Sequence, residues 1–384
     1  MRFEKNGTKL ILFPEGRIDS SNSQAFADDL FAVTDSEFEG DKNCDIEMNM
    51  SGVAYMSSAA LRVLVKYKKE GYLPHLVEVN DDLYDILDVT GFTELFSVKK
   101  ALRKLSLDGC KLIGKGFCGS VYRIDDDTIV KVYDSTDALP VIESEQRNAR
   151  SAFVKGIPTA ISYDIVQVGD KLGTVFELLK AKSFNDLIIE SPENIRQITE
   201  DYVDFLKTVH ETEMDPKTLP RAQDVYLEYL DMVRPYLSEE LGDRLADFIR
   251  SYPDDNHAVH GDFQMKNVML VDGEPMLIDM ETFCMGQPVF ELSGLYVTYQ
   301  LFRENDPGNS MDFLGIPDES AGMIWDIIIS RYYSNEERDS KMREISILGL
   351  LRFLRIIVGS SLRDSELGKW RISNSRKRLE QLLV

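Results

Sequence analysis

The most informative stretch of this chain is His260-Gly261-Asp262-Phe263-Gln264-Met265-Lys266-Asn267. Apolar runs follow Asn267 and precede Asp279, and a polar turn at residues 272–275 separates them, so we expect a loop followed by two short strands. This hairpin would bring Asp262, Asn267 and Asp279 to one cleft. A carboxylate that orients a hydroxyl, with an amide and a second carboxylate that offer oxygens to Mg²⁺, is the set that phosphoryl transfer requires.

A glycine-rich stretch upstream would supply the phosphate-binding part of such a cleft. Gly114, Gly116 and Gly119 form a GxGxxG pattern, which is weak evidence alone and also opens dinucleotide-binding folds. Here a strand, a turn at residues 125–127 and a second strand follow it, instead of a helix. Lys131 lies in that second strand, where it would reach the α- and β-phosphates. The glycines would let backbone N–H groups approach phosphate oxygens closely.

A helix is expected over residues 141–154, and it carries two acids that are candidates to pair with Lys131. We expect the partner to be Glu145, because Ala149 lies one turn later and leaves room for close packing. Glu143 stays open as the alternative.

Two more strands follow this helix before the pattern becomes helical. The second strand ends at Glu177 to Leu179, which would form a hinge whose backbone binds adenine. From residue 184 onward, apolar residues recur at helical spacing, and we expect these stripes to form core. We interpret His210 and His257 as structural residues.

The combination of glycine-rich stretch, lysine strand, acid-bearing helix, hinge and acidic loop resembles the aminoglycoside phosphotransferase and choline kinase family. The parts come in the order of protein-kinase-like enzymes, but Gly261 stands where protein kinases carry arginine, and Ile278-Asp279-Met280-Glu281 replaces Asp-Phe-Gly. Gly286-Gln287-Pro288 and Glu291-Leu292 continue the likeness, which covers about residues 105–384.

This resemblance implies roles for the residues identified above. Asp262 would be the catalytic base, with His260 supporting its loop, and Asn267 and Asp279 would hold Mg²⁺. Glu291 stands where family members often have aspartate, a change that we expect to affect lobe packing more than catalysis. The nucleotide, expected to be ATP, would be bound by Gly114, Gly116, Gly119, Lys131, Glu145, Glu177 and Leu179.

The first hundred residues alternate strands and helices, which indicates a separate α/β domain. This part resembles the STAS fold of anti-sigma-factor antagonists in residues 16–19, 45–50 and 55–62. In that family a serine at a helix N-terminus is phosphorylated, but Ala59 occupies the usual acceptor position here. Ser58 is then a possible regulatory phosphosite, because a phosphate there would lie near a positive helix end. The simpler interpretation is that Ser57 and Ser58 cap the helix.

Composition excludes several classes of partner. With 44 basic and 66 acidic residues among 384, the formal charge of −22 argues against nucleic acid or an anionic membrane as the main partner. The four scattered cysteines, with no CxxC pair, fit reduced thiols better than disulfides or a zinc site. Neither a signal peptide nor a membrane-spanning stretch is evident, so we expect a cytoplasmic protein.

The sequence therefore predicts an α/β STAS-like domain followed by an α+β, two-lobed, protein-kinase-like domain. Its parts would be a regulatory or partner-binding domain at residues 1–104, an antiparallel N-lobe at 105–180 and a mainly helical C-lobe at 181–384. The expected activity is ATP- and Mg²⁺-dependent phosphorylation of a hydroxyl on an unknown small molecule. Two alternatives stay open: a protein serine kinase acting on STAS domains, and a non-catalytic nucleotide sensor.

Overall fold

The computed structural model describes residues 1–38, 45–116 and 119–383. The chain divides into two compact units, Met1–Leu105 and Ser106–Val384, and each has its own apolar core. Cys110 and Cys284 are free thiols, whereas Cys44 and Cys118 lie outside the described residues. Within the described part of the chain, no helix has both the length and the apolar character needed to cross a membrane.

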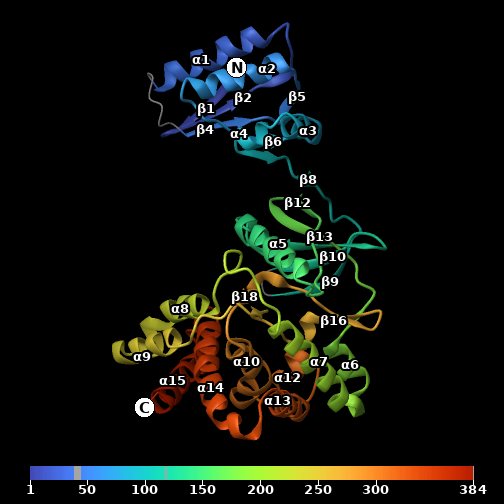
Figure 1. Ribbon diagram of the computed structural model, residues 1–384, viewed down its shortest axis with the longest axis vertical. Coiled ribbons are helices and arrows are strands. Elements are labelled where there is room, and N and C mark those ends of the chain that lie inside the picture. Colours follow the sequence, from blue (N-terminus) through green and yellow to red (C-terminus); the bar gives the residue numbers. More distant parts are fainter. Residues whose placement is uncertain (39–44, 117–118, 384) are drawn as a thin grey trace. The chain divides into compact units, whose positions relative to one another are not determined.

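The first unit is built on a mixed sheet with the strand order β1-β2-β4-β6-β7. β1 pairs with β2 in antiparallel fashion, and the remaining neighbours in this sheet are parallel. Helices α1 and α2 pack on the same side of the sheet (Figure 1). The elements are β1 (Arg2–Asn6), β2 (Lys9–Phe13), β3 (Glu15–Ile18), α1 (Ser23–Phe38), β4 (Asp45–Asn49), β5 (Gly52–Met56), α2 (Ser58–Lys69), β6 (His75–Val79), α3 (Asp81–Val89), α4 (Phe92–Leu95), β7 (Val98–Lys100) and β8 (Arg103–Lys104).

Side-chain alternation explains how this sheet buries one face. In β2, Leu10 and Leu12 are fully buried while their neighbours are only partly covered, which is the period-two pattern of a half-buried strand. Ser57 is the N-cap of α2, because its hydroxyl accepts the N–H of Ala60 at 3.4 Å. Ser58 is the first helical residue and is exposed.

The second unit begins with an antiparallel sheet in which β12, β13, β11, β10 and β9 are successive neighbours. This sheet and the long helix α5 form the N-lobe (Figure 1). The elements are β9 (Lys111–Lys115), β10 (Gly119–Arg123), β11 (Thr128–Tyr133), α5 (Leu139–Val154), β12 (Asp164–Val168) and β13 (Lys171–Glu177).

The rest of the second unit is mainly helical. Helix α14 contacts α8 and α10, which precede it in the chain, and α15, which follows it. A π-helical turn, Val297–Leu301, follows α10. The elements are β14 (Lys182–Ser183), α6 (Phe184–Glu190), α7 (Ile195–His210), α8 (Ala222–Val233), α9 (Glu239–Arg250), β15 (Ala258–Val259), β16 (Val268–Val271), β17 (Glu274–Leu277), β18 (Cys284–Met285), α10 (Pro288–Tyr296), α11 (Phe302–Asn305), α12 (Asn309–Leu314), α13 (Asp318–Tyr332), α14 (Asn335–Val358) and α15 (Glu366–Leu382).

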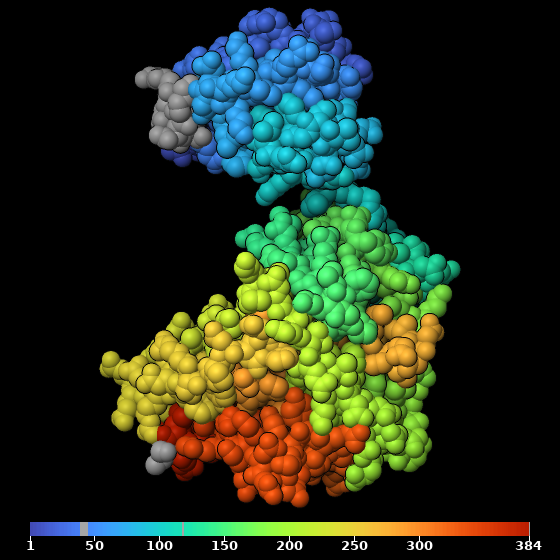
Figure 2. All heavy atoms as spheres, viewed as in Figure 1, coloured from blue at the N-terminus to red at the C-terminus, as the bar shows by residue number. Residues whose placement is uncertain are grey.

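The hairpin expected after Asn267 is formed by β16 and β17, and its turn is tighter than predicted. Glu274 and Pro275 belong to β17, which leaves only Asp272 and Gly273 in the turn. Both have positive φ, 50° and 88°, as a two-residue type I′ turn requires. β16 also pairs with β14, and the orange surface of the hairpin lies beside the yellow-green segment that contains α6 (Figure 2).

Candidate active site

The loop that carries Asp262 leaves β15 in a conformation that only glycine adopts easily. Gly261 has φ +81°, and a Cβ on it would collide with the backbone oxygen of Thr282. The Thr282 hydroxyl donates to the carbonyl of His260 at 2.9 Å, so this close approach is also hydrogen bonded. The glycine in place of the protein-kinase arginine is therefore required by local packing.

Glu291, at the start of α10, holds the backbone of this loop. Its carboxylate is fully buried and accepts the N–H groups of His260 at 2.6 Å, Gly261 at 3.0 Å and Phe263 at 3.2 Å. Burial would raise the pKa of Glu291, but His210, His260 and the Gly261 amide outweigh it and lower the pKa. Glu291 therefore acts on the catalytic loop itself, which differs from our expectation that it would mainly affect lobe packing.

His260 links this loop to the segment that carries Asp279. Its Nδ1 lies 3.3 Å from the N–H of Asp262, and its Nε2 lies 3.1 Å from the carbonyl oxygen of Ile278. The tautomer that satisfies both contacts accepts at Nδ1 and donates from Nε2. The ring is fully buried, so it positions backbone and does not face an acceptor.

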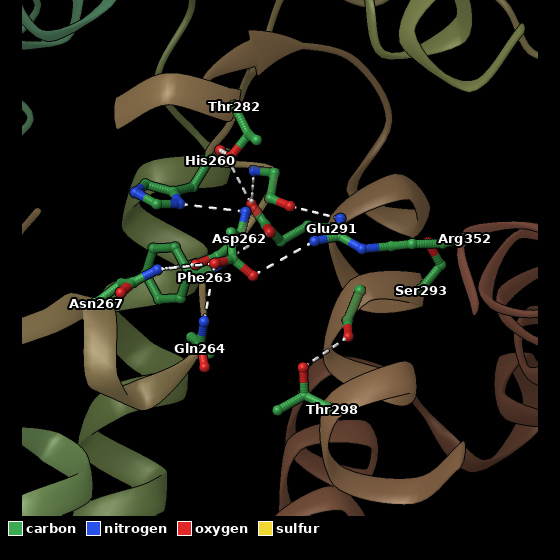
Figure 3. Close-up of polar contacts among 12 residues, drawn as sticks. His260, Asp262, Phe263, Gln264, Asn267, Thr282, Glu291, Ser293, Thr298 and Arg352 are labelled. Atoms are coloured by element: carbon green, nitrogen blue, oxygen red, sulfur yellow. Dashed lines mark hydrogen bonds and ion pairs between the residues drawn. The ribbon is translucent and has the colours of Figure 1, made fainter. Parts of the chain in front are cut away.

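Asp262 is held by side chains on two sides (Figure 3). Its Oδ2 accepts hydrogen bonds from Gln264 Nε2 at 2.8 Å and from Asn267 Nδ2 at 3.0 Å. Its Oδ1 lies 3.4 Å from Nη2 of Arg352, a residue of α14. Sequence reasoning missed Gln264 and Arg352. The position of Gln264 two residues after Asp262 was a usable signal, but Arg352 had none.

Asn267 and Asp279 are placed side by side by the backbone, since the N–H of Ile278 donates to the carbonyl of Asn267 at 3.0 Å. The Asn267 amide nitrogen is committed to the backbone oxygen and carboxylate of Asp262, so its amide oxygen is left to accept a cation. Within the described ranges, no cluster of three or more His, Cys, Asp or Glu could hold a metal. One amide and one carboxylate still fit Mg²⁺, which commonly takes its remaining ligands from water and phosphate.

Lys131 lies at the centre of a charged group that includes Glu145 and Asp279. Its Nζ is 3.1 Å from Glu145 Oε2 and 2.9 Å from Asp279 Oδ1. Burial would lower the pKa of Lys131, but Glu145 and Asp279 outweigh it and raise the pKa well above its ordinary value. The acid that the structure places against Lys131 is thus Glu145, while Glu143 is exposed.

Tyr133 fixes the orientation of Glu145, and sequence reasoning missed it. Its hydroxyl lies 2.6 Å from Glu145 Oε2 and 3.3 Å from the Thr174 hydroxyl. Tyr133 follows Lys131 by two positions on β11, so strand alternation puts both side chains on one face. That spacing was a signal that the sequence offered.

Helix α5 makes a second contact with the site, about one turn after Glu145. The side-chain nitrogen of Asn148 donates to the carbonyl of Met280 at 3.0 Å and lies 3.4 Å from that of Glu281. The same helix therefore positions both the partner of Lys131 and the backbone that follows Asp279.

The glycine-rich loop has a different requirement at each position. A Cβ on Gly119 would collide with the backbone oxygen of Val132, so this glycine is demanded by strand packing. A Cβ on Gly114 or Gly116 would meet nothing closer than 3.6 Å in the protein, which leaves those two available to a ligand. Phe117 and Cys118, between Gly116 and Gly119, lie outside the described residues.

A pocket of about 520 Å³ lies at the expected hinge. Leu179 lines it, while Glu177 lies at the exposed end of β13. The N–H of Leu178 is already bonded to the carbonyl of Asp127 at 2.7 Å. Leu270, from β16, lines the pocket as well and was not foreseen. The lining residues are Leu178, Leu179, Lys180, Ala181, Lys182, Leu187 and Leu270.

Comparison with known protein families identifies both units. Residues 109–314 match the phosphotransferase enzyme family, and residues 1–105 match the STAS domain. The N-terminal unit is therefore a STAS domain, as the sequence predicted. No curated protein matched the chain.

Aminoglycoside phosphotransferases are among the solved structures to which this chain is similar. ADP-bound APH(2'')-Ib is 16% identical, with 72% of this chain and 94% of that chain covered and a TM-score of 0.48. The apo form of a thermostable mutant of APH(4)-Ia is 12% identical, with 71% and 93% covered and a TM-score of 0.49. The streptomycin–ATP complex of APH(2'')-IIa is 14% identical, with 72% and 93% covered and a TM-score of 0.46.

Proposed function

Because this chain belongs to the phosphotransferase enzyme family, we propose that it transfers the γ-phosphoryl group of ATP to a hydroxyl group of a small molecule. The observation that carries this proposal is one connected set of polar contacts. Lys131 contacts Asp279 at 2.9 Å, and Asn267 contacts Asp262 at 3.0 Å. The set supports a cleft that holds phosphates at one end and orients a hydroxyl at the other.

Each group has a defined role in this reaction. Asp262 orients the acceptor hydroxyl and accepts its proton, while Lys131 and the glycine loop hold the phosphates. Asn267 and Asp279 would hold Mg²⁺, which when bound neutralises charge on the phosphate oxygens. Asp279 contacts Lys131 directly at 2.9 Å, so a bound phosphate and Mg²⁺ would compete with this ion pair for the two side chains.

The adenine ring would occupy the pocket beside Leu179, whose lining includes apolar side chains from the hinge and Leu270 of β16. The acceptor is a hydroxyl-bearing small molecule whose identity is open. ATP is a cytoplasmic metabolite, so the proposed reaction implies a cytoplasmic location. The STAS domain is proposed as a module for regulation or for binding a protein partner, with Ser58 as its exposed candidate phosphosite.

A thermal-shift series with ATP, GTP and ADP, each with and without Mg²⁺, tests the nucleotide site. A ligand at about a hundred times its Kd stabilises the folded state by about 2.7 kcal/mol, which raises Tm by several degrees. We expect a Mg²⁺-dependent shift with ATP that is lost in Asp279→Ala. It should be retained in Glu274→Ala, which changes an exposed acid of the neighbouring hairpin.

An acceptor screen completes the test. We expect one of a panel of alcohols, including kanamycin, choline and glucosamine, to yield a phosphomonoester. Mass spectrometry of the incubated protein follows phosphorylation of Ser58 in the same samples. Nucleotide binding without transfer to any alcohol, or transfer to protein serines alone, would contradict the proposal.

A further inference from the structure

A residue from the C-terminal helical layer reaches the catalytic loop. Arg352 lies on α14, beyond residues 109–314 that match the family. Its Nη1 donates to the carbonyl of Gly261 at 2.5 Å, and its Nη2 lies 3.4 Å from Asp262 Oδ1. The side chain is only 13% exposed. An arginine is always charged, so this guanidinium is a fixed positive group beside the carboxylate (Figure 3).

The path of Arg352 to the loop depends on a glycine in another helix. A Cβ on Gly294, in α10, would lie 2.9 Å from Nη1 and 3.1 Å from Cζ of Arg352. Glycine is unfavourable within a helix, so its presence there calls for a packing reason. The helices also meet at Gly349 of α14, where a Cβ would lie 2.7 Å from the ring of Tyr296. Both glycines allow α14 to approach α10 so closely that the Arg352 side chain passes α10 at Gly294 and reaches the catalytic loop.

The two carboxylate oxygens of Asp262 have unequal surroundings. Oδ2 accepts from both Gln264 and Asn267, whereas the contact of Oδ1 is the longer one to Arg352. Oδ1 therefore has the free capacity to accept a hydrogen bond from a substrate hydroxyl. A partial rotation of the carboxylate would move Oδ2 away from Gln264 and Asn267 and turn Oδ1 to a new direction, and the contact of Oδ1 with Arg352 opposes that rotation.

We propose that Arg352 is a positioning residue, which fixes the Gly261 carbonyl and the Asp262 carboxylate so that Oδ1 faces the acceptor hydroxyl. This inference rests on the proposed function of Asp262 as the acceptor-orienting base. Small errors of placement reduce the rate of a positioned reaction strongly. The C-terminal helices thus complete the catalytic site through one side chain, and their role is not limited to packing.

The kinetic test compares Arg352→Met and Arg352→Lys with wild type. Phosphate release from Mg·ATP with water as the acceptor provides the assay, and nucleotide-binding stoichiometry corrects for the folded fraction. We expect Arg352→Met to lower kcat by about tenfold or more while KM for ATP stays within about twofold, and Arg352→Lys to restore part of kcat. Arg355→Met is the matched control, because Arg355 is exposed on the same helix.

Gly294→Ala tests the same contact from the opposite side. It should lower kcat by about as much as Arg352→Met, while the double variant Gly294→Ala/Arg352→Ala should be within about twofold of Arg352→Ala alone. Independent, multiplicative losses in the double variant would overturn the proposed coupling.

Hydrogen exchange of the peptide covering residues 258–268 gives a readout that does not depend on turnover. We expect faster exchange in Arg352→Met and Gly294→Ala, and wild-type exchange in Arg355→Met. If wild type turns over ATP and Arg352→Met has the same kcat and the same hydrogen exchange as wild type, this inference is overturned. The proposed function would then stay intact. Absence of wild-type turnover with water and with every alcohol of the acceptor panel would instead contradict the proposed function, and hydrogen exchange would then decide whether Arg352 holds the loop.

Discussion

Glu291 shows how much of the site depends on one buried carboxylate. It accepts three backbone N–H groups of the catalytic loop, and substitution by glutamine would turn one acceptor into a donor facing those groups. We expect Glu291→Gln to lower the free energy of unfolding by about 3 kcal/mol, since buried donors would lose their partner. Urea denaturation at neutral pH measures this, and Glu366→Gln, at a side chain 95% exposed, is the control. Equal stabilities of the two variants would refute this role.

The same residue predicts a pH dependence. The folded-state pKa of Glu291 is lowered from 4.5, so its contribution to stability is fully present above about that pH. As the pH falls through the lowered folded-state value, that contribution is lost. The difference in unfolding free energy between wild type and Glu291→Gln should therefore be constant from pH 7 to pH 5 and narrow below about pH 4.5. A difference that widens in acid would contradict this sign.

Tyr133 offers a test of the nucleotide end of the cleft. Tyr133→Phe removes the hydroxyl that contacts Glu145 at 2.6 Å and leaves the ring in place. We expect Mg·ATP to bind about fivefold more weakly, which corresponds to about 1 kcal/mol for one hydrogen bond. Isothermal titration calorimetry measures this, and Tyr84→Phe in the STAS domain is a matched control. Unchanged affinity in Tyr133→Phe would show that Glu145 needs no such support.

At the scale of elements, α5 couples two parts of the cleft. Asn148→Leu keeps the size of the side chain but removes its hydrogen bond to the backbone after Asp279. We expect the KM for Mg·ATP to rise about tenfold, because Asp279 loses part of its backbone support. Steady-state kinetics measures this, and Arg150→Leu, at an exposed position of α5, is the control. Equal KM values in the two variants would mean that α5 acts through Glu145 alone.

Elements with local signals were predictable from sequence. The strand–turn–strand after the glycine loop, the lysine of β11 and the hairpin after Asn267 each depend on neighbours within a few residues. The choice of Glu145 rested on the small residue one turn away, and the structure places Glu145 against Lys131. The position of Arg352 was not predictable. It lies 90 positions from Asp262, and a contact between distant helices leaves no spacing rule in the sequence.

The requirements on particular glycines were also hidden from sequence. Gly119 was interpreted as a phosphate-binding glycine, but strand packing alone excludes a side chain there. Nothing in the sequence indicated what Gly294 packs against, because its neighbour Arg352 comes from another helix. Gly119 is constrained by the backbone of the neighbouring strand and Gly294 by the Arg352 side chain, and residue patterns encode neither contact.

At the scale of the whole molecule, the predicted fold class is confirmed: a STAS domain precedes a two-lobed, kinase-like unit of the phosphotransferase enzyme family. Each unit has its own core, so we expect two transitions in scanning calorimetry of the full chain. Mg·ATP should raise the Tm of only one of them, since ligand stabilises the unit that binds it. A single transition that moves as a whole would contradict this independence.

The central claim is that Asp262 serves transfer of the γ-phosphoryl group to a hydroxyl. ³¹P NMR of Mg·ATP with wild-type protein and the acceptor panel follows ATP loss and phosphomonoester formation together. We predict that wild type forms the ester and that Asp262→Asn lowers turnover by about 10²–10⁴-fold while keeping the ATP-induced thermal shift. Turnover in Asp262→Asn equal to that of wild type would contradict the claim.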